Sequence, residues 1–299
     1  MNRILLKISS RLTLIVSIAV LGGCVSTPFG GRPGPKMSPA PMPGVEVGQS
    51  FIYSDGHRET VIAVKGDQVT WRSKNGIIRG SYRNPILPYH SWKSSTRRAR
   101  GWIEGSPEFL WPMVTGKSGH FDLYRDVENN DGSNTRRYHQ RWSCDVSNTK
   151  TVIWKKHPSN AYVVKCDRYY NGIWRQRRFI DYVPAVGAVV AIKNEFRSSP
   201  STLQELVRME FDTSILQKSE RASLFGVVQQ VLQDPSPRSK RVWRASSHPV
   251  EVTVRSLDNY KSPDGRSCQH YVGSFRVQNR VLENFRTACR AQTGTWVQG

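Results

Sequence analysis

The chain has 299 residues, of which 44 are Lys or Arg and 23 are Asp or Glu, so its formal net charge is +21. A charge of this size favours anionic partners such as membrane surfaces, lipopolysaccharide, acidic polymers or nucleic acid. Nucleic acid is the least favoured member of that set, because the N-terminal residues predict export.

The N-terminal segment predicts export and a lipid anchor. An apolar stretch from Leu12 to Leu21 follows three basic residues, Arg3, Lys7 and Arg11. This is the pattern of a secretory signal, and the stretch is too short for a membrane-spanning helix. It ends in Leu21-Gly22-Gly23-Cys24, which resembles the lipobox of bacterial lipoproteins. The resemblance implies that residues 1–23 are a signal peptide and that Cys24 carries lipid; the alternative is a plain signal peptide with an incidental cysteine.

The residues after Cys24 predict which membrane holds the protein. Removal of residues 1–23 leaves 41 basic and 23 acidic residues, a net charge of +18. Val25, Ser26 and Thr27 follow Cys24, so no acidic residue stands next to it. Under the sorting rule of enteric bacteria, this resembles an outer-membrane lipoprotein. We therefore expect a protein anchored by lipid to the cell outer membrane, with its folded part in the periplasm or on the surface, and no cofactor besides the lipid.

Residues 24–46 are predicted to be a linker. Six prolines and several glycines fall in this segment, with almost no large apolar side chain. Such a composition favours a semi-extended tether that buries no core. Cohesive structure is expected from near Val47.

Residues 47–212 are predicted to form an all-β domain. Short β-branched and aromatic runs alternate with a period of two and are separated by turn residues. The clearest runs are Ser50–Tyr53, Thr60–Val64, Val69–Arg72, His120–Tyr124, Arg137–Cys144, Thr151–Lys155, Tyr162–Tyr170, Ile173–Tyr182 and Val189–Phe196. About ten antiparallel strands of this kind predict a β-sandwich or an open barrel.

Residues 213–299 are predicted to be a smaller β domain with one helix. The helix begins near Ser219, and its apolar residues recur at helical spacing: Leu224, Val227, Val228, Val231 and Leu232. Asp234-Pro235-Ser236-Pro237 ends it. Strands are expected at Arg241–Arg244, Val250–Arg255, Ser267–Val277 and Leu282–Arg290. The chain is therefore expected to be mainly β.

The C-terminal segment resembles a known family. Val242-Trp243-Arg244, Gly265-Arg266-Ser267-Cys268-Gln269-His270-Tyr271, Thr287-Ala288-Cys289-Arg290 and Gly294-Thr295-Trp296 follow one another in this order. Their order and spacing resemble the C-terminal domain of the rickettsial 17 kDa surface-antigen family of outer-membrane lipoproteins, from near Ser219 to the end. Gln269 departs from the Arg usual there, and the glycine-zipper segment of the shorter antigens is missing. The resemblance implies location and fold, because the family has no established enzymatic activity.

The four cysteines other than Cys24 predict two disulfides. An even number of cysteines in an exported protein favours disulfide bonds. Closeness in sequence favours Cys144–Cys166 and Cys268–Cys289, one in each domain. Zinc is the rival, but the chain has no CxxC motif and no histidine pair at ligand spacing.

Arginines interleaved with aromatic residues are the candidate anion-binding residues: Arg97, Arg98, Arg100, Arg175, Arg177 and Arg178. Guanidinium groups suit phosphate and carboxylate. In a strand, Arg175 and Arg177 share one face with Phe179, roughly 7 Å apart, and Arg178 shares the other with Trp174. The alternative is that these are ordinary solvated faces of a basic protein.

The sequence favours binding over catalysis. Thr115-Gly116-Lys117-Ser118 ends like a phosphate-binding loop, but Trp111 stands where its first glycine belongs. The seven histidines form no metal or triad motif, so we expect no enzyme and no metal site. We therefore expect a non-enzymatic outer-membrane lipoprotein, structural or bound to an anionic envelope component such as lipopolysaccharide or peptidoglycan. The alternatives are an adaptor or assembly subunit of an envelope protein complex and an unrecognised periplasmic hydrolase.

Overall fold

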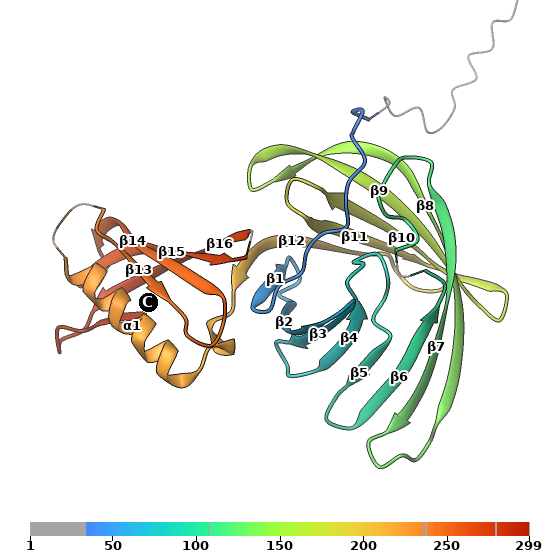
Figure 1. The fold of residues 1–299 in the computed structure, drawn as a ribbon, viewed down its shortest axis with the longest axis horizontal. Coiled ribbons are helices and arrows are strands. Elements are labelled where there is room, and N and C mark those ends of the chain that lie inside the picture. The colour runs from blue at the N-terminus through green and yellow to red at the C-terminus, as the bar shows by residue number, and fades with distance from the viewer. Residues whose placement is uncertain (1–33, 107, 235, 237, 279, 299) are drawn as a thin grey trace, which may run out of the picture. The chain divides into compact units, whose positions relative to one another are not determined.

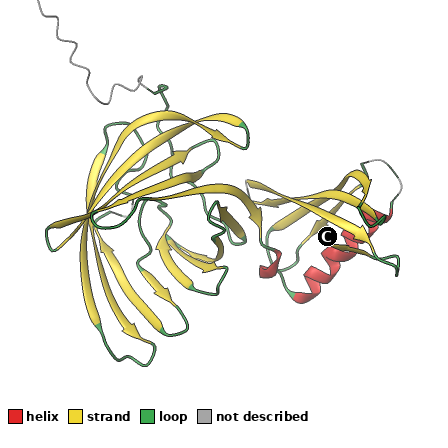
Figure 2. Ribbon diagram, turned by 180° about the vertical axis from the view of Figure 1, so that it is seen from behind, coloured by secondary structure: helices red, strands yellow, loops and turns green. Residues whose placement is uncertain are grey.

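The computed structural model describes residues 34–298, except 107, 235, 237 and 279. The signal peptide, Cys24 and the first part of the linker lie outside these residues. In the described part the protein is mainly β, with one α-helix and one short 3₁₀ helix. Figure 2 shows how far strands predominate.

Twelve antiparallel strands form a closed barrel in which each strand pairs with its neighbours in the chain (Figure 1). The strands are β1 Gln49–Tyr53, β2 Arg58–Lys65, β3 Gln68–Ser73, β4 Ile78–Tyr82, β5 Ser91–Lys93, β6 Arg97–Glu104, β7 Ser118–Asn129, β8 Arg136–Trp154, β9 His157–Tyr170, β10 Ile173–Val183, β11 Ala188–Phe196 and β12 Thr202–Phe211. Closure comes from β1, which pairs with β12 from Gln49↔Phe211 to Tyr53↔Leu206.

The expectation of a sandwich or an open barrel is therefore wrong, because the sheet closes into a barrel. Alternating inward and outward residues satisfy a sandwich and a barrel equally, and the pairing of the first strand with the last has no local signal. Closure removes the two exposed sheet edges that an open arrangement would leave. Two of the expected runs, Arg137–Cys144 and Thr151–Lys155, belong to the single long strand β8.

The segment 34–46 lies against the barrel interior and is not a free tether. The backbones of Ala40 and Met113 exchange hydrogen bonds of 3.1 and 2.8 Å, and Ala40 is only 2% exposed. Hydroxyl groups of two barrel strands bind its carbonyls: Thr149 Oγ1 donates to Pro35 O and Tyr162 Oη to Ser38 O, both at 2.7 Å. The tether expectation is wrong here because small side chains and donor-free prolines fit an interior whose hydroxyl groups satisfy their carbonyls.

Apolar side chains from three segments outside the strands fill part of the barrel. Ala40, Ile86 and Met113 come from residues 34–46, 83–90 and 105–117 and are each at most 2% exposed. They belong to one core cluster with inward residues of β7 to β10. The disulfide Cys144–Cys166 lies in this cluster and joins directly paired residues of β8 and β9.

A helix and a second sheet follow the barrel (Figure 2). The 3₁₀ helix η1 Thr213–Ile215 leads into α1 Lys218–Gln233. The sheet has the order β13-β14-β15-β16-β17, with β13 Lys240–Arg244, β14 Val250–Lys261, β15 Ser267–Val277, β16 Arg280–Arg290 and β17 Trp296–Gln298. The disulfide Cys268–Cys289 joins β15 and β16. Both predicted disulfides and the predicted helix are thus confirmed.

The element type changes after β12, near the boundary expected at residue 212. Phe211, the last residue of β12, stacks on Phe275 of β15 with ring centroids 4.7 Å apart. The Asn284 side chain donates to the Phe211 carbonyl at 2.8 Å and accepts from its N–H at 2.9 Å. The barrel's last strand therefore ends inside the core of the second sheet.

Candidate binding site inside the barrel

Three arginines of the barrel wall point inward: Arg125 on β7, Arg168 on β9 and Arg178 on β10. Strand alternation places each on the same face as a buried core residue two positions away, namely Leu123, Cys166 and Ile180. We call these three residues the lumenal arginine cluster. Each is half-buried.

Trp142 on β8 organises two members of the cluster. It is 2% exposed and lies directly opposite Arg168 in the β8–β9 register. Gln176 of β10 is the direct partner of Arg168, so Arg178 is its diagonal neighbour on the next strand. The guanidinium carbons of Arg168 and Arg178 lie 5.8 and 5.1 Å from the centroid of the Trp142 ring. One aromatic ring thus holds two cations by cation–π contacts.

No carboxylate neutralises the cluster among the described residues, since none of its members forms an ion pair there. Arg178 Nε donates to Asn194 Oδ1 at 3.0 Å, and Arg125 Nη2 donates to the carbonyl oxygen of Tyr89. The Nε atoms of Arg125 and Arg168 are buried and have no partner in the described part of the protein. Buried donors in this state require water or a ligand that accepts hydrogen bonds.

The electrostatics follow from this arrangement. Removal from water and, after it, the charge of Arg168 together lower the pKa of Arg178 to about 10. Desolvation followed by the charge of Arg168 also lowers the pKa of Arg125. Both side chains remain cations at neutral pH. An anion placed among them would relieve their mutual repulsion.

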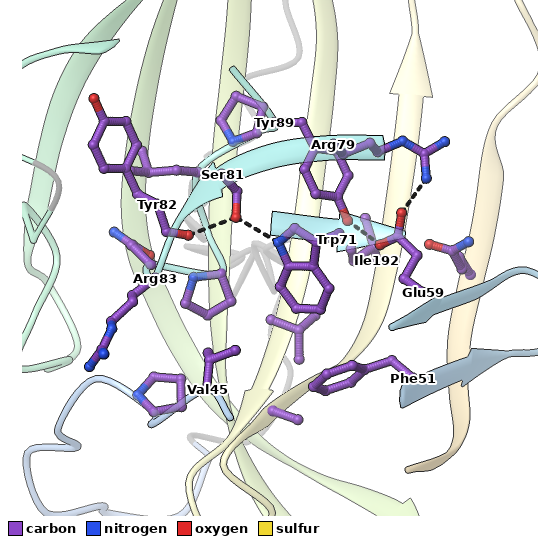
Figure 3. A pocket seen from close by; sticks show the side chains of 18 of the residues that line it. Val45, Phe51, Glu59, Trp71, Arg79, Ser81, Tyr82, Arg83, Tyr89 and Ile192 are labelled. Carbon is purple, nitrogen blue, oxygen red and sulfur yellow. Dashed lines mark hydrogen bonds and ion pairs between the residues drawn. The ribbon is translucent and has the colours of Figure 1, made fainter. Parts of the chain in front are cut away.

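A cavity of about 340 Å³ adjoins the cluster, and Arg178 contributes to its wall. Its aromatic lining comes from Phe51, Tyr53, Trp71, Tyr82 and Tyr89. Figure 3 shows Phe51 and Trp71 together on one side, with the Trp71 indole N–H directed at Ser81. The rings of Phe51 and Trp71 meet edge to face with centroids 5.6 Å apart. The cavity therefore offers apolar surface next to a cationic end.

The one carboxylate in the cavity wall, Glu59, is already bound by its neighbours. It is 4% exposed and accepts hydrogen bonds from Arg79 and Tyr89 (Figure 3), and from His57 Nε2 at 3.1 Å. Burial alone would raise the pKa of Glu59, but the hydrogen bonds from His57 and Tyr89 and the charge of Arg79 hold it below its ordinary value. Glu59 thus offsets Arg79 and leaves the lumenal arginine cluster uncompensated.

The structure separates the six arginines singled out in the sequence. Arg178 lies inside the barrel. Trp174 was expected on the same face, and this is wrong, because a bulge between Trp174 and Gln176 shifts the alternation. The Trp174 indole N–H donates to Asp167 at 2.9 Å, on the face of Arg177. Arg177 forms a two-bond pair with Asp167, at 2.9 and 3.0 Å, and Arg98 donates to Glu128 at 2.6 Å. Arg97, Arg100 and Arg175 are exposed. These six residues therefore do not form one surface.

Arg125 and Arg168 were missed because their runs carry no Arg-rich signature. The available signal was positional: each stands at a core-facing place of a period-two strand, where an apolar side chain is expected. The described residues contain no group of three or more His, Cys, Asp or Glu placed to hold a metal ion. Within the same residues, no helix combines the length and apolarity required to cross a bilayer.

Comparison with known proteins identifies no family for this chain. No protein-family model matches the chain, and no curated protein sequence matches it. The C-terminal resemblance to the rickettsial 17 kDa surface-antigen family therefore has no family match behind it. One similar solved structure is the hypothetical lipoprotein YmcC from Escherichia coli K12, at 10% sequence identity and a TM-score of 0.37, covering 60% of this chain and 91% of that chain.

Proposed function

We propose that this protein is a non-enzymatic outer-membrane lipoprotein, anchored through Cys24, whose barrel binds an anionic ligand in its lumen. The observation that carries the proposal is the lumenal arginine cluster, three inward cations without a carboxylate partner in the described residues. Arg125 and Arg168 each keep a buried donor atom without a protein partner. Unpaired charges inside a protein cost folding free energy, and a bound anion would compensate this cost.

The chemistry of the cluster suits binding rather than catalysis. Guanidinium groups supply charge and directed hydrogen-bond donors, but at neutral pH they provide neither a nucleophile nor a general base. The four described cysteines are held in two disulfides. For an exported protein, the available anions are those of the envelope, and phosphate or carboxylate groups of lipopolysaccharide or peptidoglycan are the candidates.

The proposal is tested with an amphiphilic anion, 1-anilinonaphthalene-8-sulfonate, titrated against the purified soluble form that begins at residue 25. Replacement of Arg168 and Arg178 by Gln should lower the affinity about tenfold or more, because each guanidinium supplies a charge-assisted contact. The matched control is Arg100→Gln with Arg177→Gln, which removes the same charge from the outer faces of β6 and β10. Arg175 is unsuitable as a control, because its charge acts on Arg168. Equal loss in both double variants would show that net charge alone attracts the probe.

A second candidate function, an adaptor in an envelope protein complex, is favoured by apolar residues exposed on the second sheet. Phe285 and Val281 of β16 are 58% and 54% exposed, and Val242 of the edge strand β13 is 53% exposed. Such residues and an unpaired strand edge suit protein contact. A complex formed here would survive high salt and would be lost on Phe285→Ser, whereas anion binding in the barrel would show the opposite behaviour.

A further inference from the structure

We infer that the lumenal arginine cluster is a site for a phosphate monoester whose organic part lies in the adjoining aromatic cavity. This inference rests on the proposed function and specifies its ligand. It follows from the number and kind of unpaired groups, the charge they carry, and the size and lining of the cavity.

The unpaired groups are all hydrogen-bond donors. The Nε atoms of Arg125 and Arg168 and the indole Nε1 of Trp142 are buried without a partner in the described residues. An indole N–H donates only, and a guanidinium has five donors and no acceptor. Within residues 34–298 the hydrogen bonds of the cluster run from Arg178 to Asn194 and from Arg125 to Tyr89. A ligand that takes the place of water here must therefore be rich in acceptors and poor in donors.

A phosphate monoester meets this requirement better than a carboxylate. It presents three terminal oxygens and close to two negative charges at neutral pH, whereas a carboxylate presents two oxygens and one charge. Three guanidinium groups face the lumen, and Arg168 and Arg178 are diagonal neighbours that share the Trp142 ring. A dianion can accept from both of them and still has an oxygen directed toward Arg125.

The size and lining of the cavity limit the organic group to which the phosphate is attached. At about 340 Å³ it stands at the lower end of ligand pockets, which suits one small organic group and not a whole lipid A or a polymer. Arg178 lies in its wall together with Phe51 and Trp71. The phosphate is therefore placed at the Arg178 end, and a sugar ring or a short acyl chain lies against the aromatic rings.

The test uses two matched pairs of ligands, measured by isothermal titration calorimetry on the chain beginning at residue 25. Glucose 6-phosphate is compared with glucuronate, and hexyl phosphate with heptanoate. In the pair whose organic part fits, the phosphate should bind about tenfold more tightly or better than the carboxylate. Which pair binds distinguishes a sugar phosphate from an alkyl phosphate.

The pH dependence supplies a second readout. A phosphate monoester takes its second charge with a pKa near 6, so its affinity should rise between about pH 5 and 7. Glucuronate keeps one charge over that range, and heptanoate keeps its charge from about pH 6 upward, where the phosphate still gains charge. The carboxylate of each pair therefore reports any effect of pH on the protein itself. The ionisable groups that face the site include His57, Glu59, Arg79 and Tyr89 in the cavity wall, and His90, whose pKa is lowered by burial and by the charge of Arg125. The difference between the two slopes belongs to the phosphate.

Variants localise the effect. Arg168→Lys with Arg178→Lys keeps both charges but removes the forked donors, so the preference for phosphate should shrink while the fold is retained. Arg100→Gln with Arg177→Gln, on the outer faces of β6 and β10, should leave the preference unchanged. Two results would overturn the phosphate assignment: equal affinity for phosphate and carboxylate, or no binding of either pair. The proposed function would remain intact if binding of 1-anilinonaphthalene-8-sulfonate still depended on Arg168 and Arg178. A probe insensitive to those residues would overturn both.

Discussion

Arg168 is the member of the lumenal arginine cluster whose charge acts on both of the others. Its charge lowers the pKa of both Arg125 and Arg178, after the larger effect of their removal from water. Two arginines on diagonal positions of adjacent strands repel each other in a medium less polar than water. The contacts with Trp142 offset part of this cost. The cluster is thus maintained at the expense of the stability of the ligand-free protein.

This reasoning predicts that Arg168→Met stabilises the ligand-free protein. Methionine keeps a flexible side chain against Trp142 and removes the repulsion, which should increase the free energy of unfolding on the order of 1 kcal/mol and raise Tm by about 2 °C. The measurement is calorimetric unfolding at low salt. Arg177→Met is the control, because it breaks the pair with Asp167 and should lower Tm. A fall in Tm of the same size in both variants would contradict the account.

At the residue scale, the sequence predicts part of the site. Period two correctly separates Arg178 from Arg177, and the structure places Arg178 opposite the inward Cys166. The sequence does not reveal that β7 and β9 bring Arg125 and Arg168 to the same lumen, because inward and outward faces are equivalent until the barrel closes. Nor does it reveal that Asp167 and Glu128 pair with the outer arginines. Both facts depend on the register of neighbouring strands.

At the scale of elements, the start of α1 is fixed by one carboxylate. Glu220 accepts from the backbone N–H of Ser246 and Ser247, both at 2.8 Å, and from the N–H of Gln217 at 3.0 Å. These bonds, the one from the Ser247 backbone above all, lower the pKa of Glu220 from 4.5 to about 2. The carboxylate thereby ties the first turn of the helix to the loop that follows β13.

The pKa of Glu220 predicts a specific acid sensitivity. A carboxyl group whose pKa is lower in the folded state stabilises the fold above its ordinary pKa of 4.5, and this contribution is lost as the pH falls from 4.5 towards 2. Glu220→Gln should therefore be less stable at pH 7 and show a flatter dependence of unfolding midpoint on pH within that window. Urea denaturation at a series of pH values measures this. The exposed Glu283→Gln is the control, and parallel curves for wild type and Glu220→Gln would contradict the assignment.

The segment 34–46 is the element for which composition misleads. Proline and glycine content predicts a tether, yet Ala40 is buried, and Met37 and Met42 pack against the barrel core. Composition measures how much apolar surface a segment brings and contains no information about a cavity formed by distant strands. The helix, by contrast, is predictable because its period of 3.6 residues is local: Leu224, Val231 and Leu232 are all buried.

The position of this segment predicts that Ala40→Asp destabilises the barrel. Ala40 is 2% exposed, so a carboxylate introduced there loses its hydration. We therefore expect the free energy of unfolding to fall by about 3 kcal/mol or more. Guanidinium chloride unfolding measures the loss, and proteolysis within residues 34–46 should accelerate. Pro39→Asp, one residue earlier and exposed, is the matched control. Equal stability of the two variants would mean that the segment is not held in solution.

At the scale of the whole molecule, a lipid on Cys24 would place the binding site close to the membrane, because the chain enters the barrel soon after that residue. Thr149 holds the carbonyl of Pro35 in the barrel, and ten residues, 25–34, separate Pro35 from Cys24. Ten residues span at most about 35 Å when fully extended. A barrel on so short a connection would stay within reach of the lipid surface, where phosphate-bearing envelope components are concentrated.

This arrangement depends on the anchor, and the anchor predicts the fate of Cys24→Ser. If Cys24 carries lipid, the variant lacks the thioether and the cleavage that follows it, so the protein should remain uncleaved or appear in soluble form. Membrane fractionation with metabolic palmitate labelling measures this, and the chain beginning at residue 25 behind a cleavable signal serves as the soluble control. Both should keep the ligand affinity of the barrel, because residues 34–298 contain the whole site. An unlabelled Cys24→Ser protein recovered in the outer membrane at the wild-type level would show that the barrel or the second sheet, and not lipid, holds the protein there.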